Sequence, residues 1–340
     1  MDLLPDEAQQ EIIDATATFL DDAMPIGRLR EGGRPAARPD DALLRQMGEL
    51  GWFGLGLPED LGGIGSSLAE EVLLFREIGR RVGSVQLLAT VLATRVAAAG
   101  GDPVRAEALV AGAERAGWAE PIGAVSIANR SVEGRFQVFD GRDADCWIAA
   151  DESGAVLLDP RASRAEEHPC LDEFTDLAHV AFEGAAPLAR VGPEDALVER
   201  AAVLAASMLS GLAESARDQG AAYARERFQF GKPIGIFQAV KHPCADMAVR
   251  CEASWSQTCH AALALRDGRE DAAFQVSAAK HLAGEAAQEN AAANLQVHGG
   301  YGFTTEYDAH LLVKRAHVLR AIAGGSRHHL RRILAAPPQT

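Results

Sequence analysis

Apolar residues recur with a helical period over most of the first hundred positions. The apolar face of the first such segment has spacings of four, three and four, set by Ala8, Ile12, Ala15 and Phe19. Two further helices are expected at 43–50 and 68–82, the latter capped by Ser67. Between them, 50–67 is so rich in glycine that we expect no regular element, and the stretch from Arg30 to Pro39 reads as a loop.

The pattern changes between 122 and 188, where short apolar runs alternate with clusters of Gly, Asp and Pro, as is typical of a small antiparallel β unit. From Pro193 onward the chain is alanine-rich and helical again. Four long helices and a short fifth after Gly325 are predicted, the four at 193–228, 240–267, 271–298 and 308–322. Antiparallel helices joined by short loops predict an up-and-down bundle. We therefore expect a mainly α protein with a β insert, divided at 1–118, 119–190 and 191–340.

Composition narrows the classes of function. The chain has 33 Lys and Arg against 48 Asp and Glu, a formal net charge of −15, which disfavours binding to nucleic acid. No uncharged apolar run approaches the roughly 18 residues that suggest a membrane span. The N-terminus is acidic and does not resemble a signal peptide, and five cysteines without paired spacing do not suggest a disulfide framework. The cytoplasm is the expected location.

Metal chemistry is not expected. Cys244, Cys251 and Cys259 are seven and eight residues apart, which separates them by about 10 to 12 Å along a helix. A zinc ion holds its thiolate ligands at about 2.3 Å, so these three cannot share one metal. Their spacing is that of a stripe packed in a helical core.

Two stretches combine polar, aromatic and glycine residues in a way that suits a planar ligand carrying phosphates. In RERFQFGKPIGIFQ, 225–238, Arg227 and two glutamines surround three phenylalanines at a turn between helices. In QVHGGYGF, 296–303, three glycines in four residues follow a helix and expose backbone N–H groups. Each stretch is also compatible with an ordinary helix end and turn.

Together with LGWFGLGLPEDLGGIGSS, 50–67, these stretches resemble the acyl-CoA dehydrogenase family, in the family's order and over nearly the whole chain. The resemblance implies an N-terminal helical domain, a small middle β-barrel and a C-terminal four-helix bundle. It also implies FAD at a dimer interface. By motif position, Arg227 would contact the pyrophosphate of FAD, and the same site would be lined by Gln229, Phe230 and Gln238. The adenosine diphosphate portion of a partner's FAD would be contacted by Gln296, Val297, Gly299 and Gly300.

The resemblance further implies a flavoprotein oxidoreductase that converts an acyl-CoA to the 2,3-enoyl-CoA. In the family a carboxylate removes the α proton, the flavin accepts the β hydride, and electrons pass to an electron-transfer flavoprotein. The chain departs from this pattern because Ala323 stands where many members carry the glutamate base. Other members carry the base early in the first bundle helix, where Glu199 lies near the matching position, Ala201. Two positions along a helix turn a side chain by about 200°, so Glu199 could serve only with a loop adjustment or a small helix defect, and a solvated glutamate paired with arginine is the alternative.

The middle region is also reduced, since only AEPIGAVS, 119–126, remains of a flavin-holding strand, while WIAA, 147–150, resembles the strand that stacks on the flavin. Three readings follow. The chain is one subunit of a heteromeric acyl-CoA dehydrogenase, such as those acting on sterol side-chain CoA thioesters in lipid or steroid catabolism. In the second reading, the chain is a self-sufficient enzyme that uses Glu199 or another base. In either of these two readings, the assembly is a homotetramer or heterotetramer. In the third reading, the chain is a non-catalytic structural subunit that has lost the base and FAD.

Overall fold

In a computed structural model the chain is described at residues 3–33, 37–127 and 131–337. It forms two compact units that are each discontinuous in sequence. The first consists of Met1–Gly32, Val72–Gly83 and Ala202–Thr340, and the second of Gly33–Glu71 and Ser84–Ala201. The domain limits expected from the sequence stay predictions.

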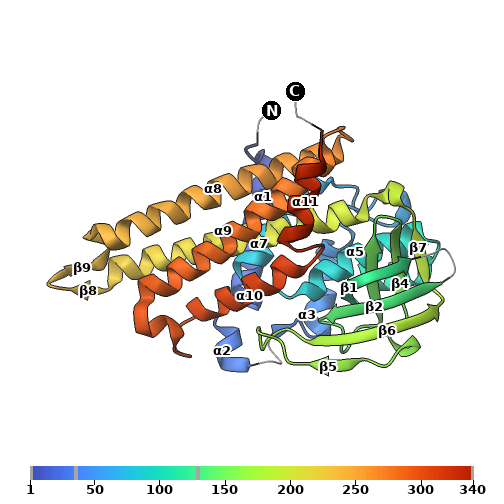
Figure 1. The fold of residues 1–340 in the computed structure, drawn as a ribbon, viewed down its shortest axis with the longest axis horizontal. Coiled ribbons are helices and arrows are strands. Elements are labelled where there is room, and N and C mark those ends of the chain that lie inside the picture. The colour runs from blue at the N-terminus through green and yellow to red at the C-terminus, as the bar shows by residue number, and fades with distance from the viewer. Residues whose placement is uncertain (1–2, 34–36, 128–130, 338–340) are drawn as a thin grey trace. The chain divides into compact units, whose positions relative to one another are not determined.

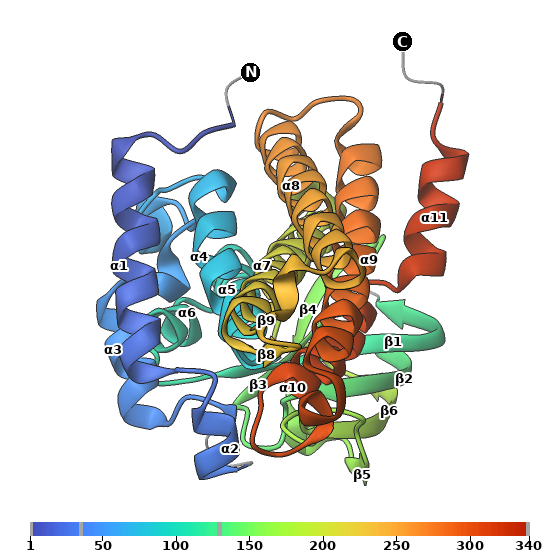
Figure 2. The ribbon, with the colours of Figure 1, turned by 90° about the vertical axis from the view of Figure 1, so that its left-hand side faces the viewer.

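The first unit is helical. Its complete helices are α1 (Glu7–Ala23), α2 (Arg28–Gly32), α8 (Gln238–Arg266), α9 (Ala272–His298), α10 (Ala309–Ala321) and α11 (Ser326–Ala335). It also holds most of α4 (Leu68–Arg80) and of α7 (Leu197–Glu226). α8 runs alongside α9, and α10 and α11 pack on α9 from its other sides (Figures 1 and 2).

α7 is a long and mostly buried helix. By length and composition its apolar stretch could cross a bilayer, but 78% of that window is buried inside the protein, the pattern of a core helix. α4 approaches α7 closely because two glycines lie at their contact. A Cβ on Gly211 would lie 1.9 Å from the carbonyl oxygen of Arg76, and one on Gly79 would lie 2.1 Å from that of Met208.

Beside this contact, the buried carboxylate of Glu214 on α7 joins the two helices. Arg76 on α4 donates to both of its oxygens, with Nη2–Oε1 at 2.7 Å, and Arg80 Nη1 lies 2.8 Å from Oε2. The guanidinium of Arg76 also lies 4.3 Å from the ring centroid of Trp255 on α8. One carboxylate therefore holds two arginines of the neighbouring helix.

The second unit contains a seven-stranded sheet with the order β5-β6-β2-β1-β3-β4-β7 (Figure 1). The strands are β1 (Ala116–Ile127), β2 (Val132–Phe139), β3 (Cys146–Asp151), β4 (Gly154–Leu158), β5 (Glu166–His168), β6 (Leu177–Ala185) and β7 (Ala189–Val191). β1 and β3 are parallel and the other pairs are antiparallel. One face carries an apolar core that includes Phe136, Trp147 and Phe182. The helices of this unit are α3 (Asp41–Glu49), α5 (Val85–Ala99) and α6 (Pro103–Val110).

The fold class predicted from the sequence, mainly helical with a β insert, is confirmed. The small middle β-barrel takes the form of this sheet, with β5 and β7 at its two ends. The first strand begins at Ala116, earlier than the pattern indicated, and a short helix, α2, occupies part of the predicted loop. The interpretation of WIAA as a flavin-stacking strand is not supported, because the Trp147 side chain is buried in the sheet core with 3% of its surface exposed.

Candidate functional site

The first candidate stretch forms a hairpin between the end of α7 and the start of α8. Strands β8 (Phe228–Gln229) and β9 (Lys232–Pro233) pair in an antiparallel manner, and the turn uses positive φ at Phe230 (53°) and Gly231 (74°). Phe230 is 91% exposed, and its ring meets that of Phe237 edge to face at 6.1 Å. Gln229 and Gln238 are exposed on the same hairpin and at the first turn of α8. The hairpin therefore presents amides and apolar rings outward.

The second stretch forms the end of α9 and the 3-10 turn Gly299–Phe303. Gly299 has a φ of 60°, which favours glycine. A Cβ added at Gly299 or Gly300 would meet no atom within 4 Å, so an open space borders the backbone at both positions. Gln296 is exposed and Val297 half-buried on the last turn of α9.

An aromatic cluster brings the two stretches together. The guanidinium of Arg227, just after α7, lies 5.4 Å from the ring centroid of Tyr301, a distance at which cation–π attraction is effective. One turn earlier on α7, Tyr223 stacks on His298 with ring centroids 4.2 Å apart. Tyr307 packs edge to face against Tyr223 at 5.9 Å. The arginine of one motif and the glycine turn of the other thus border one surface.

The electrostatics of this surface suit an anion. Arg227 is half-buried, and within the described part of the chain it has no ion pair with a carboxylate. Burial raises the pKa of the Tyr223 phenol, and the charge of Arg227 opposes this rise. A half-buried guanidinium beside an exposed glycine backbone is a donor set for a diphosphate, because guanidinium binds phosphate bidentately and glycine lets the backbone approach closely.

The two positions considered for the catalytic base, 199 and 323, lie outside both FAD motifs in the sequence. Glu199 is half-buried in the first turn of α7, within the second compact unit, whereas the FAD motif residues belong to the first unit. Ala201, two positions further along the helix, is fully buried, as the rotation between the two positions predicts. The neighbouring Arg200 pairs with the buried carboxylate of Glu71, with Nη2–Oε2 at 2.6 Å.

Ala323 lies in the turn between α10 and α11, and its φ is 55°. Its carbonyl oxygen is 3.0 Å from Nε2 of the buried His329. The buried ammonium of Lys280 on α9 donates to the carbonyl oxygens of Arg320 at 3.1 Å and of Gly324 at 3.4 Å. The turn is therefore held by an ammonium and an imidazole, neither of which the sequence pattern singled out for this place.

His329 should make the stability of this turn depend on pH. Burial, followed by the charge of Lys280, lowers the pKa of His329 from 6.5 to about 3, against the opposing hydrogen bond to Ala323. Between these values the unfolded chain binds a proton that the folded chain does not, so the free energy of unfolding falls as pH falls, by up to about 1.4 kcal/mol per pH unit.

Urea unfolding at about pH 7.5 and about pH 5 would measure this effect, with an expected loss of about 2 kcal/mol from this group. His329→Gln should remove this contribution to the loss of unfolding free energy. His328→Gln, at the exposed neighbouring position, is a matched control and should retain the contribution. An equal pH response in both variants and the parent would contradict the assignment to His329.

Comparison with known proteins decides what these motifs belong to. A family model described as the acyl-CoA dehydrogenase N-terminal domain matches residues 6–114, and one described as the C-terminal domain matches residues 195–337. Acyl-CoA dehydrogenase IpdE2 of Mycolicibacterium smegmatis is 33% identical over 287 residues, which are 84% of this chain and 85% of that protein. The chain belongs to the acyl-CoA dehydrogenase family.

Two other similarities concern length and assembly. Acyl-CoA dehydrogenase FadE34 of Mycobacterium tuberculosis is 33% identical over 313 residues, covering 90% of this chain and 43% of FadE34. The chain thus spans less than half the length of that relative. The crystal structure of the ChsE4–ChsE5 complex from Mycobacterium tuberculosis is similar with a TM-score of 0.84 at 26% identity, covering 100% of both chains.

The family predicted from the sequence is therefore confirmed. The predicted cofactor is confirmed with it, since acyl-CoA dehydrogenases are FAD enzymes. The residues present fit this group, because Arg227 and the open glycine turn provide donors for its diphosphate. The sequence interpretation missed Tyr223 and Tyr301, which hold the two motifs together. The position of Tyr223, four residues before Arg227 on a helix, was a usable signal, because that spacing puts both on one face.

Proposed function

We propose that this chain is one subunit of a heteromeric acyl-CoA dehydrogenase, contributing an FAD-binding surface while a partner subunit contributes the catalytic carboxylate. The observation that carries the proposal is the α10–α11 turn. Ala323 has no group that accepts a proton, and the imidazole beside its carbonyl oxygen, that of His329, is buried with its pKa lowered to about 3. A general base works best with a pKa near the operating pH, which His329 does not have.

In the proposed reaction an acyl-CoA loses its α proton and its β hydride to give the 2,3-enoyl-CoA. FAD supplies the two-electron acceptor when it is bound. The guanidinium of Arg227 would neutralise diphosphate charge, and Gln229, Gln238 and Gln296 would donate amide hydrogen bonds. The backbone of Gly299 and Gly300 would allow close approach, while Phe230 and Val297 would exclude water from the bound group.

Two comparisons support a second subunit. The ChsE4–ChsE5 neighbour is a complex of two proteins, and its match covers all of this chain. FadE34, of which this chain matches 43%, is long enough to hold a second unit of similar size. We extend the proposal to a bulky acyl-CoA such as a sterol side-chain thioester, to an electron-transfer flavoprotein as electron acceptor, and to the cytoplasm as the location.

The alternative of a self-sufficient enzyme rests on Glu199. Glu199→Gln removes a proton acceptor and keeps the shape of the side chain, so turnover should remain within about twofold if a partner supplies the base. A loss of about a hundredfold or more, with flavin content unchanged, would instead identify Glu199 as the base and contradict the heteromeric proposal.

Expression alone and with the products of neighbouring genes tests the assembly. We expect the chain alone to be colourless or to lack turnover, and co-expression with one such product to yield a yellow complex that oxidises an acyl-CoA. A yellow homomer with full turnover would contradict the proposal. A stable, colourless assembly that no co-expressed product rescues would favour the structural subunit that has lost FAD.

A further inference from the structure

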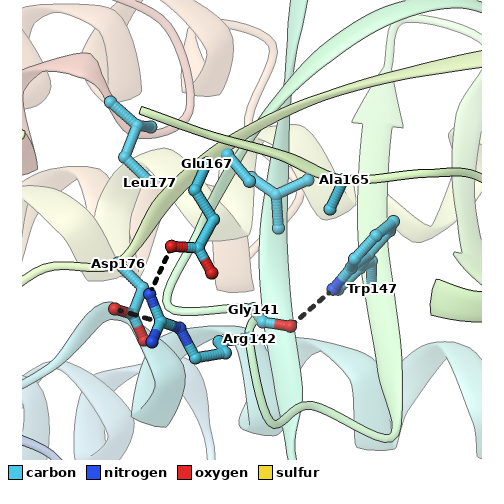
Figure 3. A pocket seen from close by; sticks show the side chains of 9 residues that line it. Gly141, Arg142, Trp147, Ala165, Glu167, Asp176 and Leu177 are labelled. Carbon is cyan, nitrogen blue, oxygen red and sulfur yellow. Dashed lines mark hydrogen bonds and ion pairs between the residues drawn. The ribbon is translucent and has the colours of Figure 1, made fainter. Parts of the chain in front are cut away.

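The sheet of the second unit contains a small cavity near its β5 end, and Trp147 is among the residues that line it. Its volume is about 180 Å³, and it is bordered by β2, β3, β5, β6 and the turn after β2 (Figure 3). A cavity of about 150 Å³ with apolar walls is large enough to bind a benzene-sized molecule in other proteins. This cavity therefore has room for a single ring.

The register of the strands explains why the cavity exists. Val138 on β2 pairs with Ala178 on β6, and Ala178 pairs with Glu167 on β5, so the three side chains share one face of the sheet. The small side chain of Ala178 leaves the middle of this row unfilled. The apolar core of the face thus ends in a hollow instead of extending to the edge strand.

The floor of the hollow is apolar. It includes the indole of Trp147, which is 3% exposed and whose Nε1 donates to the carbonyl oxygen of Gly141 at 3.0 Å. Because this hydrogen bond uses the single polar group of the indole, the ring offers a ligand only carbon surface. The floor therefore favours an apolar ring, which packs against aromatic carbon.

The charged side chains at the mouth of the cavity are engaged in ion pairs. Figure 3 shows the side chains of Arg142 and Glu167 directed toward each other, with Nη2–Oε2 at 2.8 Å. Asp176, which also borders the cavity, lies 2.8 Å from Nη1 of Arg38. Arg38 also pairs with Asp143, at 3.1 Å, so each of these charged groups already has a partner. A charged ligand would have to separate one of the pairs, whereas an uncharged ligand leaves them intact.

The Arg142–Glu167 pair also allows entry. Its side chains are 45% and 68% exposed, and ion pairs of such exposure contribute little to stability. Separation of the Arg142–Glu167 pair, which would open the cavity to a ligand, therefore costs little free energy.

We propose that this cavity is a binding site for a small uncharged aromatic or alicyclic molecule, seated on Trp147 beneath the Arg142–Glu167 pair. The site is formed by residues of the second unit alone, and it does not depend on the proposed function.

Benzyl alcohol is a suitable probe, added to the full chain in the assembly it forms and followed by saturation-transfer NMR. We expect saturable binding that weakens at least tenfold in Ala178→Leu, because the larger side chain fills the hollow. Ala181→Leu is a matched control on the same strand, since Ala181 is exposed on the opposite face, and it should bind as the parent does. Binding that does not saturate, or that is equal in Ala178→Leu, would overturn the proposal.

Charged probes with the same ring give a second test that does not depend on how Ala178→Leu folds. Benzoate and benzylammonium should bind the parent at least tenfold more weakly than benzyl alcohol. In Glu167→Gln the charge of Arg142 loses a partner, so benzoate binding should strengthen several-fold while benzylammonium does not. Equal binding of all three probes to the parent, or no change for benzoate in Glu167→Gln, would contradict the assignment.

Discussion

Replacing Glu214 with alanine should lower the free energy of unfolding by about 3 kcal/mol, because removal of one partner from a buried ion pair leaves the other charge uncompensated. Here two guanidiniums, those of Arg76 and Arg80, would lose their shared carboxylate between α4 and α7. Urea denaturation followed by circular dichroism measures the change.

Asp218 provides a control one helical turn away. It also pairs with Arg80, at 2.8 Å, but its side chain is 45% exposed, so Asp218→Ala should lower the same free energy by less than about 1 kcal/mol. Equal losses for the two variants would show that burial does not set the strength of these pairs.

Arg227→Ala should weaken FAD binding by about a hundredfold, which corresponds to about 2.7 kcal/mol and is the size expected for a lost bidentate, charge-assisted contact to phosphate. Arg227→Lys should recover only part of the affinity, since an ammonium keeps the charge but not the planar fork. Titration of the apoprotein assembly with FAD, read by quenching of flavin fluorescence, gives the dissociation constants.

Two further variants separate a specific contact from a general effect of charge. Arg225, exposed two residues earlier, carries the same charge, and Arg225→Ala should change FAD affinity by less than about threefold. Tyr301→Phe keeps a ring beside Arg227 and should bind nearly as the parent does, whereas Tyr301→Leu should lose part of the affinity. Equal affinity for Arg225→Ala and Arg227→Ala would exclude a specific role for Arg227.

Local patterns in the sequence predicted most of the helical fold. The helix expected at 271–298 is α9 at Ala272–His298, and the one expected at 308–322 is α10 at Ala309–Ala321. Such agreement is understandable, because helical period, caps and glycine breaks act within a few residues. The two FAD motifs could be recognised for the same reason, since each of them is a continuous stretch of sequence beside a helix end.

Features that depend on distant contacts could not be predicted in this way. The pairing of Arg227 with Tyr301 joins two helix ends far apart in the sequence, and the register that puts Ala178 between Val138 and Glu167 is set by the whole sheet. Trp147 shows the limit most clearly. Its short motif resembled a flavin-stacking strand, but the strand it belongs to is buried within the sheet.

The turn that holds Ala323 has a consequence for attempts to place a base in this chain. A glutamate introduced there would take the left-handed φ of 55° that Ala323 has, on a turn whose carbonyl oxygens accept hydrogen bonds from the ammonium of Lys280. The positive charge of that ammonium would attract the new carboxylate and favour its ionised form. Under the heteromeric proposal, we therefore expect Ala323→Glu alone to be insufficient to make the chain an independent enzyme.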